Sequence, residues 1–442
     1  MKKTGILPLL ILRLMRCAQR GLALLFVLVT GFLAPVAAQS FIRVSDGHFV
    51  RDGKPYYFVG TNLWYAPILA SEGQGGDRAR LSRELDRLQS MGVDNLRILV
   101  GADAGSDSAN HVRPYLQERP GVLNDTLLRG LDYLLVEMDK RDMVGVFYLT
   151  NSWDWSGGYG YYLNQTGHGQ SPYSAGEGYN NYVRYAAAFA ADERAQQLFY
   201  DYVKAIVSRT NSITGQPYRD DPTIMAWQVC NEPRAFSKEA KDGFARWIAR
   251  TVALIKQLDP NHLVSTGSEG LYGCEVDADL CERIHNDLNI DYYTIHIWPR
   301  NWQWVAIDRL IEDLPNAYLR SGEYIDLHQR MAAKAGKPLV IEEFGYPRDR
   351  NSLSRQSTTG ARDGYYSFIF NRLLESYRHQ GVLAGCNFWG WGGEAVADST
   401  TWMPGADYMV DPPHEPQGWY SVFDVDDTTI QIIERTVAAL KP

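Results

Sequence analysis

The stretch IMAWQVCNEPR, residues 224–234, decides the fold. Its first six residues are almost all apolar, which is typical of a strand buried on both faces, as in a parallel sheet covered by helices. Asn231 and Glu232 follow, and Pro233 ends the strand because proline has no N–H to donate to a sheet ladder. Burying a carboxylate is costly unless the group is paired or has a chemical task. We therefore expect Glu232 to end a buried parallel strand and to have a partner or a function there.

Seven further apolar runs of strand length occur along the chain, and segments with helical spacing separate most of them. In residues 77–92, for example, Leu81, Leu85 and Leu88 recur at helical intervals between charged residues. Eight strands that alternate with helices predict an α/β fold, a (β/α)8 TIM barrel formed by a single domain. The alternative is a doubly wound open sheet, but neither G-x-G-x-x-G nor a P-loop follows the first strand. The eight runs are YYFVGTNLWY, NLRILVG, VGVFYLTN, IMAWQVCNE, HLVSTGSEG, DYYTIHIWP, PLVIEEFG and GCNFWGWGG.

Residues 41–62, FIRVSDGHFVRDGKPYYFVGTN, come before the other runs and contain two Asp-Gly pairs. Short alternating segments that turn at Asp-Gly predict an N-terminal β-hairpin. Long stretches without periodicity follow strands at about residues 101–123, 152–185 and 392–427. Loops after the strands of a TIM barrel line the face that carries the active site, and irregular loops this long are usually functional.

The N-terminal residues have the pattern of a secretory signal peptide. The segment RGLALLFVLVTGFLAPVAAQS has a positive start, an apolar core and small residues before an expected cut after Ala38. We therefore expect residues 1–38 to be a signal peptide and residues 39–442 to form the catalytic domain of a secreted or periplasmic protein. A membrane anchor is the alternative, although the apolar run is short for a span. Met15 is an alternative start, since MRCAQR would be a good positive region before the apolar core.

Composition and charge limit the partners. The chain has 442 residues, 45% hydrophobic and 22% charged, and it contains 12 Trp and 27 Tyr. Such rings pack in cores and are also the surfaces on which pyranose rings stack. Removal of residues 1–38 takes away five basic residues and no acidic ones, which changes the net charge from −8 to −13. An acidic protein repels nucleic acid and anionic lipid, so we expect a neutral substrate, no nucleic acid, no membrane contact beyond export, and a monomer.

The five cysteines do not indicate a metal site. Cys17 leaves with the expected leader, and no spacing resembles a zinc site. Cys274 and Cys281 bracket the polar segment EVDADL, and a secreted protein could bridge them. Cys230 and Cys386 lie in apolar runs, where a small buried thiol is expected. We expect no metal and no cofactor.

Polar and aromatic residues gather at the ends of the expected strands. A lone glutamate at a strand end is often paired with arginine for structural reasons, but convergence of so many groups on one face of a barrel is harder to explain by packing. Two carboxylates that face each other across a barrel mouth suit glycosidic bond cleavage, in which one must donate a proton and the other must be ionised. The residues in question are Arg97, Asn151, Trp153, Asn231, Glu232, His296, Trp298, Glu342, Glu343 and Trp389.

These motifs resemble a known family. NEP after the fourth strand and EEFG after the seventh resemble the two catalytic signatures of glycoside hydrolase family 5, which belongs to a retaining clan with a barrel fold. RDDPTIMAWQVCNEPR, HIWPRNW, NSWDWSGG and KPLVIEEFG are similar to its β-mannanase subgroup. The resemblance covers nearly all of residues 39–442. Each motif is short, but the order and spacing of the motifs along the chain agree with those of the family.

The resemblance implies a role for each matching residue. Glu232 would be the general acid/base and Glu343 the nucleophile, with Arg97 holding Glu343 ionised. Asn231 would bind the 2-hydroxyl of the sugar at the cleavage point, a contact that strengthens in the transition state. Glu342 should point to the other side of its strand by alternation and would be structural.

The remaining matches would shape the sugar subsites. His296 and Trp298 would lie around the sugar at the cleavage point, and Trp389 would be its stacking platform. Arg234 would reach toward the leaving group, and Trp153 would form a wall. The family more often has Tyr where Trp298 stands, so a phenol hydrogen bond to the nucleophile is either missing or supplied elsewhere. The expected substrate-binding residues are Arg97, Asn151, Trp153, Asn231, Arg234, His296, Trp298 and Trp389.

The implied function is an endo-β-1,4-mannanase that cleaves β-1,4-mannosidic bonds in mannan or manno-oligosaccharides by double displacement with retention. One alternative is an exo-β-mannosidase, in which the long loop after the eighth strand, stiffened by three prolines, closes one end of the cleft. A β-1,4-glucanase would use the same machinery, since mannose differs from glucose only in the axial 2-hydroxyl. A non-catalytic glycan-binding barrel is the alternative from another class.

Overall fold

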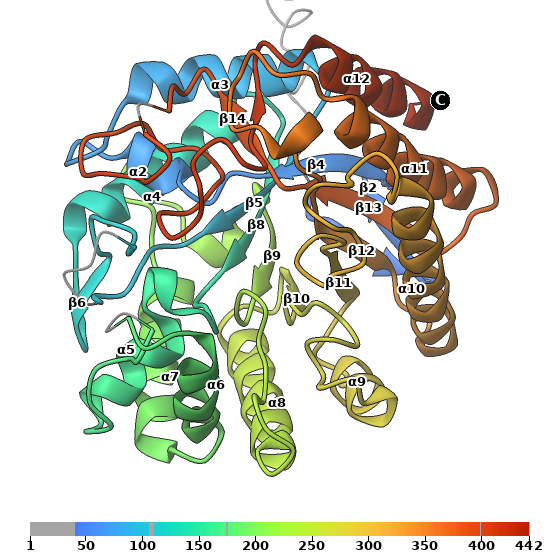
Figure 1. The fold of residues 1–442 in the computed structure, drawn as a ribbon. Coiled ribbons are helices and arrows are strands. Elements are labelled where there is room, and N and C mark those ends of the chain that lie inside the picture. Colours follow the sequence, from blue (N-terminus) through green and yellow to red (C-terminus); the bar gives the residue numbers. More distant parts are fainter. Residues whose placement is uncertain (1–39, 106–109, 174–175, 398, 442) are drawn as a thin grey trace, which may run out of the picture. The chain divides into compact units, whose positions relative to one another are not determined.

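The central feature of the computed structural model is a parallel sheet of eight strands in the order β10-β9-β8-β5-β4-β13-β12-β11, which curls into a barrel (Figure 1). This confirms the expected TIM barrel: seven strands fall within their apolar runs, and β13 begins two residues before its run. The strands are β4 (Phe58–Asn62), β5 (Asn95–Leu99), β8 (Val144–Tyr148), β9 (Ile224–Gln228), β10 (Leu263–Ser265), β11 (Tyr293–Ile297), β12 (Leu339–Phe344) and β13 (Leu383–Phe388). The structure describes residues 40–105, 110–173, 176–397 and 399–441, and the expected leader, residues 1–38, lies outside them.

The barrel is nearly closed between β10 and β11. These two strands do not share a ladder, but backbone hydrogen bonds join the segments around them. The N–H of Asp291 donates to the carbonyl of Val264 at 2.8 Å, and the N–H of His296 donates to the carbonyl of Glu269 at 3.3 Å. The chain after β10 is therefore held against β11 at the end where the active-site loops lie.

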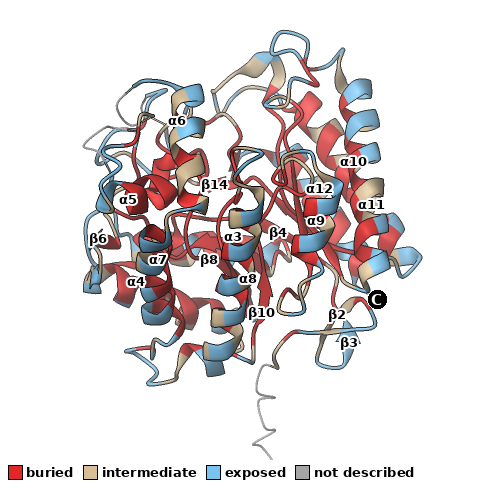
Figure 2. Cartoon of the chain, turned by 90° about the horizontal axis from the view of Figure 1, so that it is seen from below, coloured by how far each residue is buried: buried red, intermediate tan, exposed pale blue. Residues whose placement is uncertain are grey.

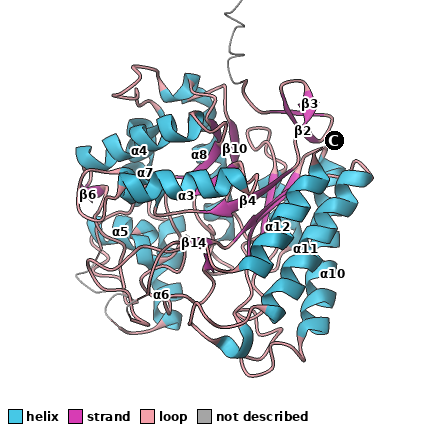
Figure 3. Ribbon diagram, turned by 90° about the horizontal axis from the view of Figure 1, so that it is seen from above, coloured by secondary structure: helices cyan, strands magenta, loops and turns pink. Residues whose placement is uncertain are grey.

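Helices surround the strands (Figure 3). Helix α3 begins where the side chain of Asp77 accepts a hydrogen bond from the N–H of Arg80 at 2.8 Å, and Leu81, Leu85 and Leu88 are fully buried, as their spacing predicted. The strands are buried on both sides, whereas the helices expose their outer faces (Figure 2). The helices are α2 (Ala66–Ala70), α3 (Arg78–Ser90), α4 (Asp125–Asp139), α5 (Gly158–Gln165), α6 (Tyr179–Ala186), α7 (Glu193–Val207), α8 (Lys241–Leu258), α9 (Ala278–His285), α10 (Leu314–Ala335), α11 (Gly360–Arg378) and α12 (Asp427–Leu440).

The expected N-terminal hairpin is present, and a third strand extends it. Strands β1 (Arg43–Ser45), β2 (His48–Arg51) and β3 (Lys54–Pro55) form an antiparallel sheet. Its two turns are the Asp-Gly pairs, and all four turn residues have φ between 49° and 76°, the left-handed region that such two-residue turns need. Two short strand pairs lie in the loops: β6 (Gln117–Arg119) with β7 (Val122–Leu123), and β14 (Trp391–Gly393) with β15 (Val422–Phe423).

The cysteines of the described residues are all buried free thiols. This confirms the expectation for Cys230 and Cys386. The disulfide that the spacing of Cys274 and Cys281 allowed is not formed in the structure. The two sulfur atoms and a ring nitrogen of His285 nevertheless lie within 4.8 Å of one another. Within the described ranges, every helix is too short or too polar to cross a membrane.

Candidate active site

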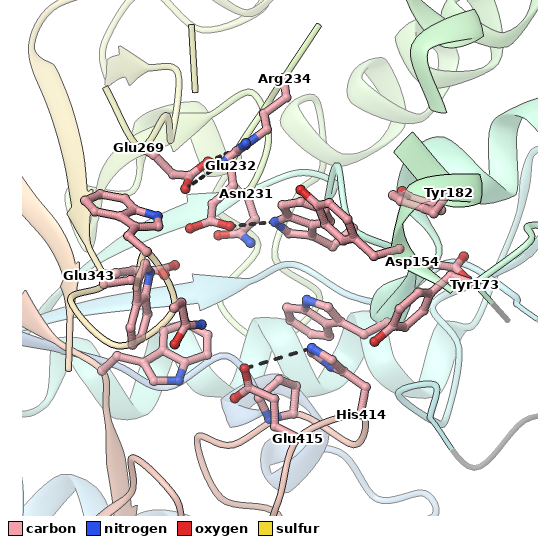
Figure 4. Close-up of a pocket in the computed structure, with 18 residues that line it drawn as sticks. Asp154, Tyr173, Tyr182, Asn231, Glu232, Arg234, Glu269, Glu343, His414 and Glu415 are labelled. Carbon is pink, nitrogen blue, oxygen red and sulfur yellow. Dashed lines mark hydrogen bonds and ion pairs between the residues drawn. The ribbon is translucent and has the colours of Figure 1, made fainter. Parts of the chain in front are cut away.

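A cavity of about 370 Å³ opens at the carboxyl ends of the barrel strands, a size suited to a small ligand (Figure 4). Strand β12 and the segments after β8, β9, β10, β11 and β13 all contribute to it. Of the three long loops, residues 152–185 and 392–427 supply lining residues, whereas residues 101–123 supply none. The cavity is lined by Trp153, Asp154, Trp155, Tyr173, Tyr179, Tyr182, Asn231, Glu232, Arg234, Glu269, Trp298, Asn301, Trp302, Glu343, Trp389, Pro412, His414 and Glu415.

Glu232 lies at the end of β9 in a strained backbone conformation. Its φ is 48°, in the left-handed region that a glutamate rarely adopts, and strain of this kind concentrates at functional sites. The backbone N–H of Glu232 donates to the carbonyl of Gly267 at 2.9 Å, which fixes the turn. Its carboxylate accepts hydrogen bonds from Nε1 of Trp153 at 2.5 Å and from Nδ1 of His296 at 2.8 Å. The carboxylate of Glu232 is therefore both paired and directed into the cavity.

Glu343, on β12, is held by a buried arginine, as expected. Oε1 of Glu343 accepts a short hydrogen bond from Nη1 of Arg97, which is fully buried. Nη2 of the same guanidinium donates to Oδ1 of Asn231 at 2.9 Å, and its Nε donates to Oε1 of Gln228 at 2.9 Å. Charge-assisted bonds of this kind fix orientation, so Arg97 aligns Glu343 and Asn231 together.

The direction expected for the Glu342 side chain was wrong, because β12 contains a β-bulge. Ile295 pairs with Ile341, but the next residue of β11, His296, pairs with Glu343, which leaves Glu342 as the extra residue. Simple alternation would place Glu342 and Glu343 on opposite faces. The bulge instead lets both reach the same guanidinium: Oε2 of Glu342 lies 3.7 Å from Nε of Arg97. Glu342 is therefore part of the base of the site.

The two expected catalytic carboxylates lie close together with His296 between them. One carboxylate oxygen of Glu232, one of Glu343 and a ring nitrogen of His296 are all within 4.8 Å of one another. Nδ1 of His296 is 2.8 Å from Glu232 and 3.3 Å from Glu343. Carboxyl groups about 5 Å apart suit a retaining glycosidase, whereas inverting enzymes need roughly 6.5 Å or more to admit a water molecule.

The charges around His296 favour its protonated form. Burial alone would lower the pKa of His296, but the charge of Glu343 and the neighbouring carboxylates of Glu232 and Glu342 raise that pKa well above its ordinary value. Burial raises the pKa of Glu232, but the hydrogen bond and charge of His296, with Arg234 and Trp153, lower it by more. These two directions favour a protonated His296 one hydrogen bond away from an ionised Glu232, and the role of Glu232 as general acid/base stays a prediction.

Five of the expected substrate-binding residues line the cavity, and three lie beneath it. Trp298 meets Trp389 edge-to-face, with ring centroids 5.9 Å apart. The amide of Asn231 donates to Oδ1 of Asn151 at 3.2 Å, so Asn151 supports Asn231 from below. The lining residues are Trp153, Asn231, Arg234, Trp298 and Trp389; those beneath are Arg97, Asn151 and His296.

A buried ion pair forms one side of the cavity, and its acidic member was missed. Arg234 donates to both carboxylate oxygens of Glu269, at 2.6 and 2.7 Å, and its guanidinium lies 5.5 Å from the ring centroid of Trp153. Burial raises the pKa of Glu269 to about 7, against the opposing charge of Arg234. Glu269 follows β10, so the strand-end argument could have found it.

The opposite side of the cavity is formed by His414 and Glu415, which were also missed (Figure 4). The ring of His414 stacks against Trp155 at an interplanar angle of 15°. Burial lowers the pKa of His414 to about 4, and burial together with neighbouring carboxylates raises the pKa of Glu415 well above its ordinary value. Both shifts favour the uncharged form of these side chains, whose Nε2 and Oε1 atoms lie 4.0 Å apart. Only the length of the loop after β13 hinted at them.

Comparison with known proteins agrees with this geometry. Residues 39–442 match the family model described as GH family 5 beta-mannosidase-like. Mannan endo-1,4-beta-mannosidase 1 from Oryza sativa subsp. japonica is 30% identical over 364 residues, covering 79% of this chain and 78% of that protein.

Solved structures give the same family. The glycoside hydrolase family 5 mannosidase from Rhizomucor miehei superposes with a TM-score of 0.83 at 34% identity, over 91% of this chain and 97% of that chain. A variant of that enzyme in complex with mannosyl-fructose has the same TM-score and identity, over 90% of this chain and 97% of that chain. The barrel, the paired glutamates at the ends of β9 and β12 and these matches lead to one conclusion: the chain belongs to glycoside hydrolase family 5, in its beta-mannosidase-like group.

Proposed function

We propose that the protein is a retaining glycoside hydrolase that cleaves β-1,4-mannosidic bonds in mannan or manno-oligosaccharides, as an endo-β-1,4-mannanase. The observation that carries the proposal is the approach of the Glu232 and Glu343 carboxylates to within 4.8 Å at the base of a cavity lined by aromatic rings. The substrate is assigned from the family and from the rice and fungal relatives. No metal or cofactor is part of the proposed chemistry.

The first step forms a glycosyl-enzyme. The sugar stacks on Trp389, and the amide of Asn231, held by Arg97, binds its 2-hydroxyl. A carboxylate oxygen of Glu343 attacks the anomeric carbon while the glycosidic bond breaks. The leaving oxygen takes a proton from Glu232, which in turn is supplied by Nδ1 of His296 at 2.8 Å.

The second step returns the enzyme to its starting state. Ester formation removes the negative charge of Glu343, which is the largest contribution that raises the pKa of His296. The ionised Glu232 then accepts a proton from water, and the resulting hydroxide equivalent attacks the anomeric carbon and releases Glu343. Glu232 then passes this proton back to Nδ1 of His296, 2.8 Å away, which restores the starting protonation of the site. Two inversions at one carbon give overall retention.

A product profile on mannohexaose, run beside cellohexaose, tests the function. We expect a mixture of shorter oligomers from mannohexaose at early times and at least about tenfold slower cleavage of cellohexaose, because the site must bind an axial 2-hydroxyl. Chromatography of samples taken below a tenth of full conversion gives the profile. Faster cleavage of cellohexaose would contradict the mannan assignment, and failure of the folded protein to cleave either would indicate a glycan-binding barrel.

Exo action is a second candidate, and one observation favours it. His414 and Glu415 line the cavity on the side away from Arg234 and Glu269 (Figure 4), and Pro412 of the same loop is also a lining residue. Arg234 is expected on the leaving-group side, so this loop lies where the non-reducing end of a substrate would bind. In this reading the loop closes the cleft, and mannose would be the only early product from mannohexaose.

Glu415 provides a test of that end of the cavity. Among the described residues, neither Oε2 of Glu415 nor Nδ1 of His414 has a hydrogen-bond partner, although both atoms are buried. We expect Glu415→Ala to lower kcat/KM on mannotriose about tenfold, the effect of losing one buried hydrogen bond to a sugar hydroxyl. Glu415→Gln, which also keeps an uncharged polar group, should retain most activity. Equal activity of Glu415→Ala and wild type would remove Glu415 from substrate binding.

Export of the protein also remains part of the proposal. The signal-peptide pattern of residues 1–38, with small residues before the expected cut after Ala38, supports a secreted or periplasmic location. N-terminal sequencing of the mature protein, expected to begin at Gln39, checks both the cut and the choice between a leader and an anchor.

A further inference from the structure

A third carboxylate lies beneath the two catalytic ones. Glu342 is 1% exposed, and its Oε1 accepts hydrogen bonds from the side-chain amide of Gln228 and, at 3.3 Å, from the hydroxyl of Tyr292. Its other oxygen, Oε2, lies 3.7 Å from Nε of Arg97 and 3.9 Å from Nε2 of His296. The bulge in β12 brings this group to the same guanidinium as the nucleophile and to Nε2 of His296, the ring nitrogen that does not face Glu232.

The contact between Glu342 and His296 is one of charge rather than of hydrogen bonding. Within the part of the chain that the structure describes, Oε2 of Glu342 and Nε2 of His296 each have no hydrogen-bond partner. A buried carboxylate oxygen without a hydrogen bond is costly, and an uncharged side chain of similar shape would cost less. Arg97, 3.7 Å from Oε2, offsets part of this cost, and the same oxygen faces Nε2 of His296 at 3.9 Å.

We propose that Glu342 is a positioning residue for proton transfer, whose negative charge keeps a proton on the pair formed by His296 and Glu232. Glu342 does not line the cavity, so it acts through the imidazole. Nε2 of His296 faces Glu342, and Nδ1 faces Oε1 of Glu232 at 2.8 Å. The inference rests on the proposed glycosidase function, because that chemistry requires Glu232 to receive a proton before the glycosidic bond breaks.

Acidic groups face His296 from several elements. At Nδ1 these are Glu232, after β9, and Glu343, on β12; at Nε2 the acidic group is Glu342. Glu269, after β10, adds a longer-range interaction with His296. The basic groups nearest to these carboxylates are Arg97 and Arg234. Glu232 and Glu343 change charge or bonding during the reaction, so Glu342 is the close acidic neighbour whose charge stays constant.

The sign of the effect follows from this arrangement. A negative charge near a group that binds a proton raises its pKa, so removing the charge lets the pair of His296 and Glu232 lose its proton at lower pH. The proton is needed for the first chemical step. Loss of the Glu342 charge should therefore move the alkaline limb of the kcat/KM profile to lower pH.

The variant that tests the proposal is Glu342→Gln, which keeps the shape and removes the charge. We expect the midpoint of the alkaline limb in the pH profile of kcat/KM on manno-oligosaccharide to move to lower pH by about one to three units. Nitrogen-15 NMR of labelled histidine should show His296, assigned by comparison with a His296→Gln sample, losing its proton over the same lower range. The proposal would be overturned if both the alkaline limb of the kcat/KM profile and the titration of His296 in Glu342→Gln matched those of the wild type.

A buried His–Asp pair elsewhere provides a matched control. Nδ1 of His262 lies 2.6 Å from Oδ2 of Asp259, and both residues are buried just before β10, at the opposite end of the barrel from the cavity. Asp259→Asn removes a buried carboxylate from a histidine without touching the site. It should leave the alkaline limb in place. An equal shift in Asp259→Asn would show that the effect is general and would overturn the assignment to Glu342.

If circular dichroism shows that Glu342→Gln does not fold, Glu342→Asp is the variant that tests the proposal. The aspartate keeps the charge but withdraws it from His296, so a smaller shift of the same sign supports the proposal, and a wild-type limb contradicts it. The NMR titration needs no turnover. If the wild-type protein cleaves no mannan, the proposed function fails, while the comparison of His296 between wild type and Glu342→Gln still tests the electrostatic contact.

Discussion

Replacing Glu343 by alanine is expected to lower kcat on manno-oligosaccharides by about 10⁴- to 10⁶-fold, the range seen when a covalent nucleophile is removed. Glu343 is 3% exposed and is aligned by Arg97 and by His296 at 3.3 Å. Glu342 is too deep in the barrel to replace it, because it does not line the cavity. Steady-state assays with mannohexaose, beside a circular dichroism spectrum of the variant, measure the loss.

The stereochemistry of the product tests the same residue independently. Proton NMR of the wild-type reaction should show the β-anomer first, since two inversions restore the starting configuration. In Glu343→Ala, added azide can occupy the place of the lost carboxylate and attack once, which gives the α-mannosyl azide from an activated aryl mannoside. Glu343→Gln, which fills that space, should not be rescued. Wild-type turnover in Glu343→Ala would reassign the nucleophile, and an inverted wild-type product would end the double-displacement account.

Much of the site could be predicted because the carboxyl ends of parallel strands meet at one face of a barrel. That rule, applied to short apolar runs, was enough to bring Glu232, after β9, and Glu343, on β12, into one cavity although 111 positions separate them. It also placed Asn231, Trp298 and Trp389 there. The helices were predictable for a similar reason, since leucines at helical spacing needed one buried face.

The rest depends on features that have no periodic signal. The bulge in β12 shifts one residue past its partner, so alternation gave the wrong face for Glu342. His414 and Glu415 come from a loop of about thirty residues, whose path depends on packing against distant side chains rather than on local spacing. The position of the proton depends on distances of 2.8 and 3.3 Å around His296, which sequence patterns do not encode.

Replacing Glu232 by alanine should give a loss that depends on the leaving group. On mannohexaose, kcat/KM is expected to fall by about 10²- to 10⁴-fold, the usual contribution of a positioned general acid. On 2,4-dinitrophenyl β-mannoside, whose leaving group needs no proton, kcat/KM should stay near the wild-type value, since it reports the first step. The second step still lacks its base, so a rapid burst of dinitrophenol should precede slow turnover.

Comparison of the two substrates separates a chemical role of Glu232 from a structural one. Loss of packing or of the hydrogen bonds to Trp153 and His296 would misplace the nucleophile and slow both substrates alike. Glu232→Gln is the matched control, because it keeps the shape and one acceptor for His296 but cannot donate or accept the catalytic proton. It should reproduce the leaving-group dependence of the alanine variant. If both variants slow both substrates by the same factor and show no burst, the acid/base group is another residue, and Glu269, a carboxyl in the same cavity whose pKa is about 7, becomes the next residue to test.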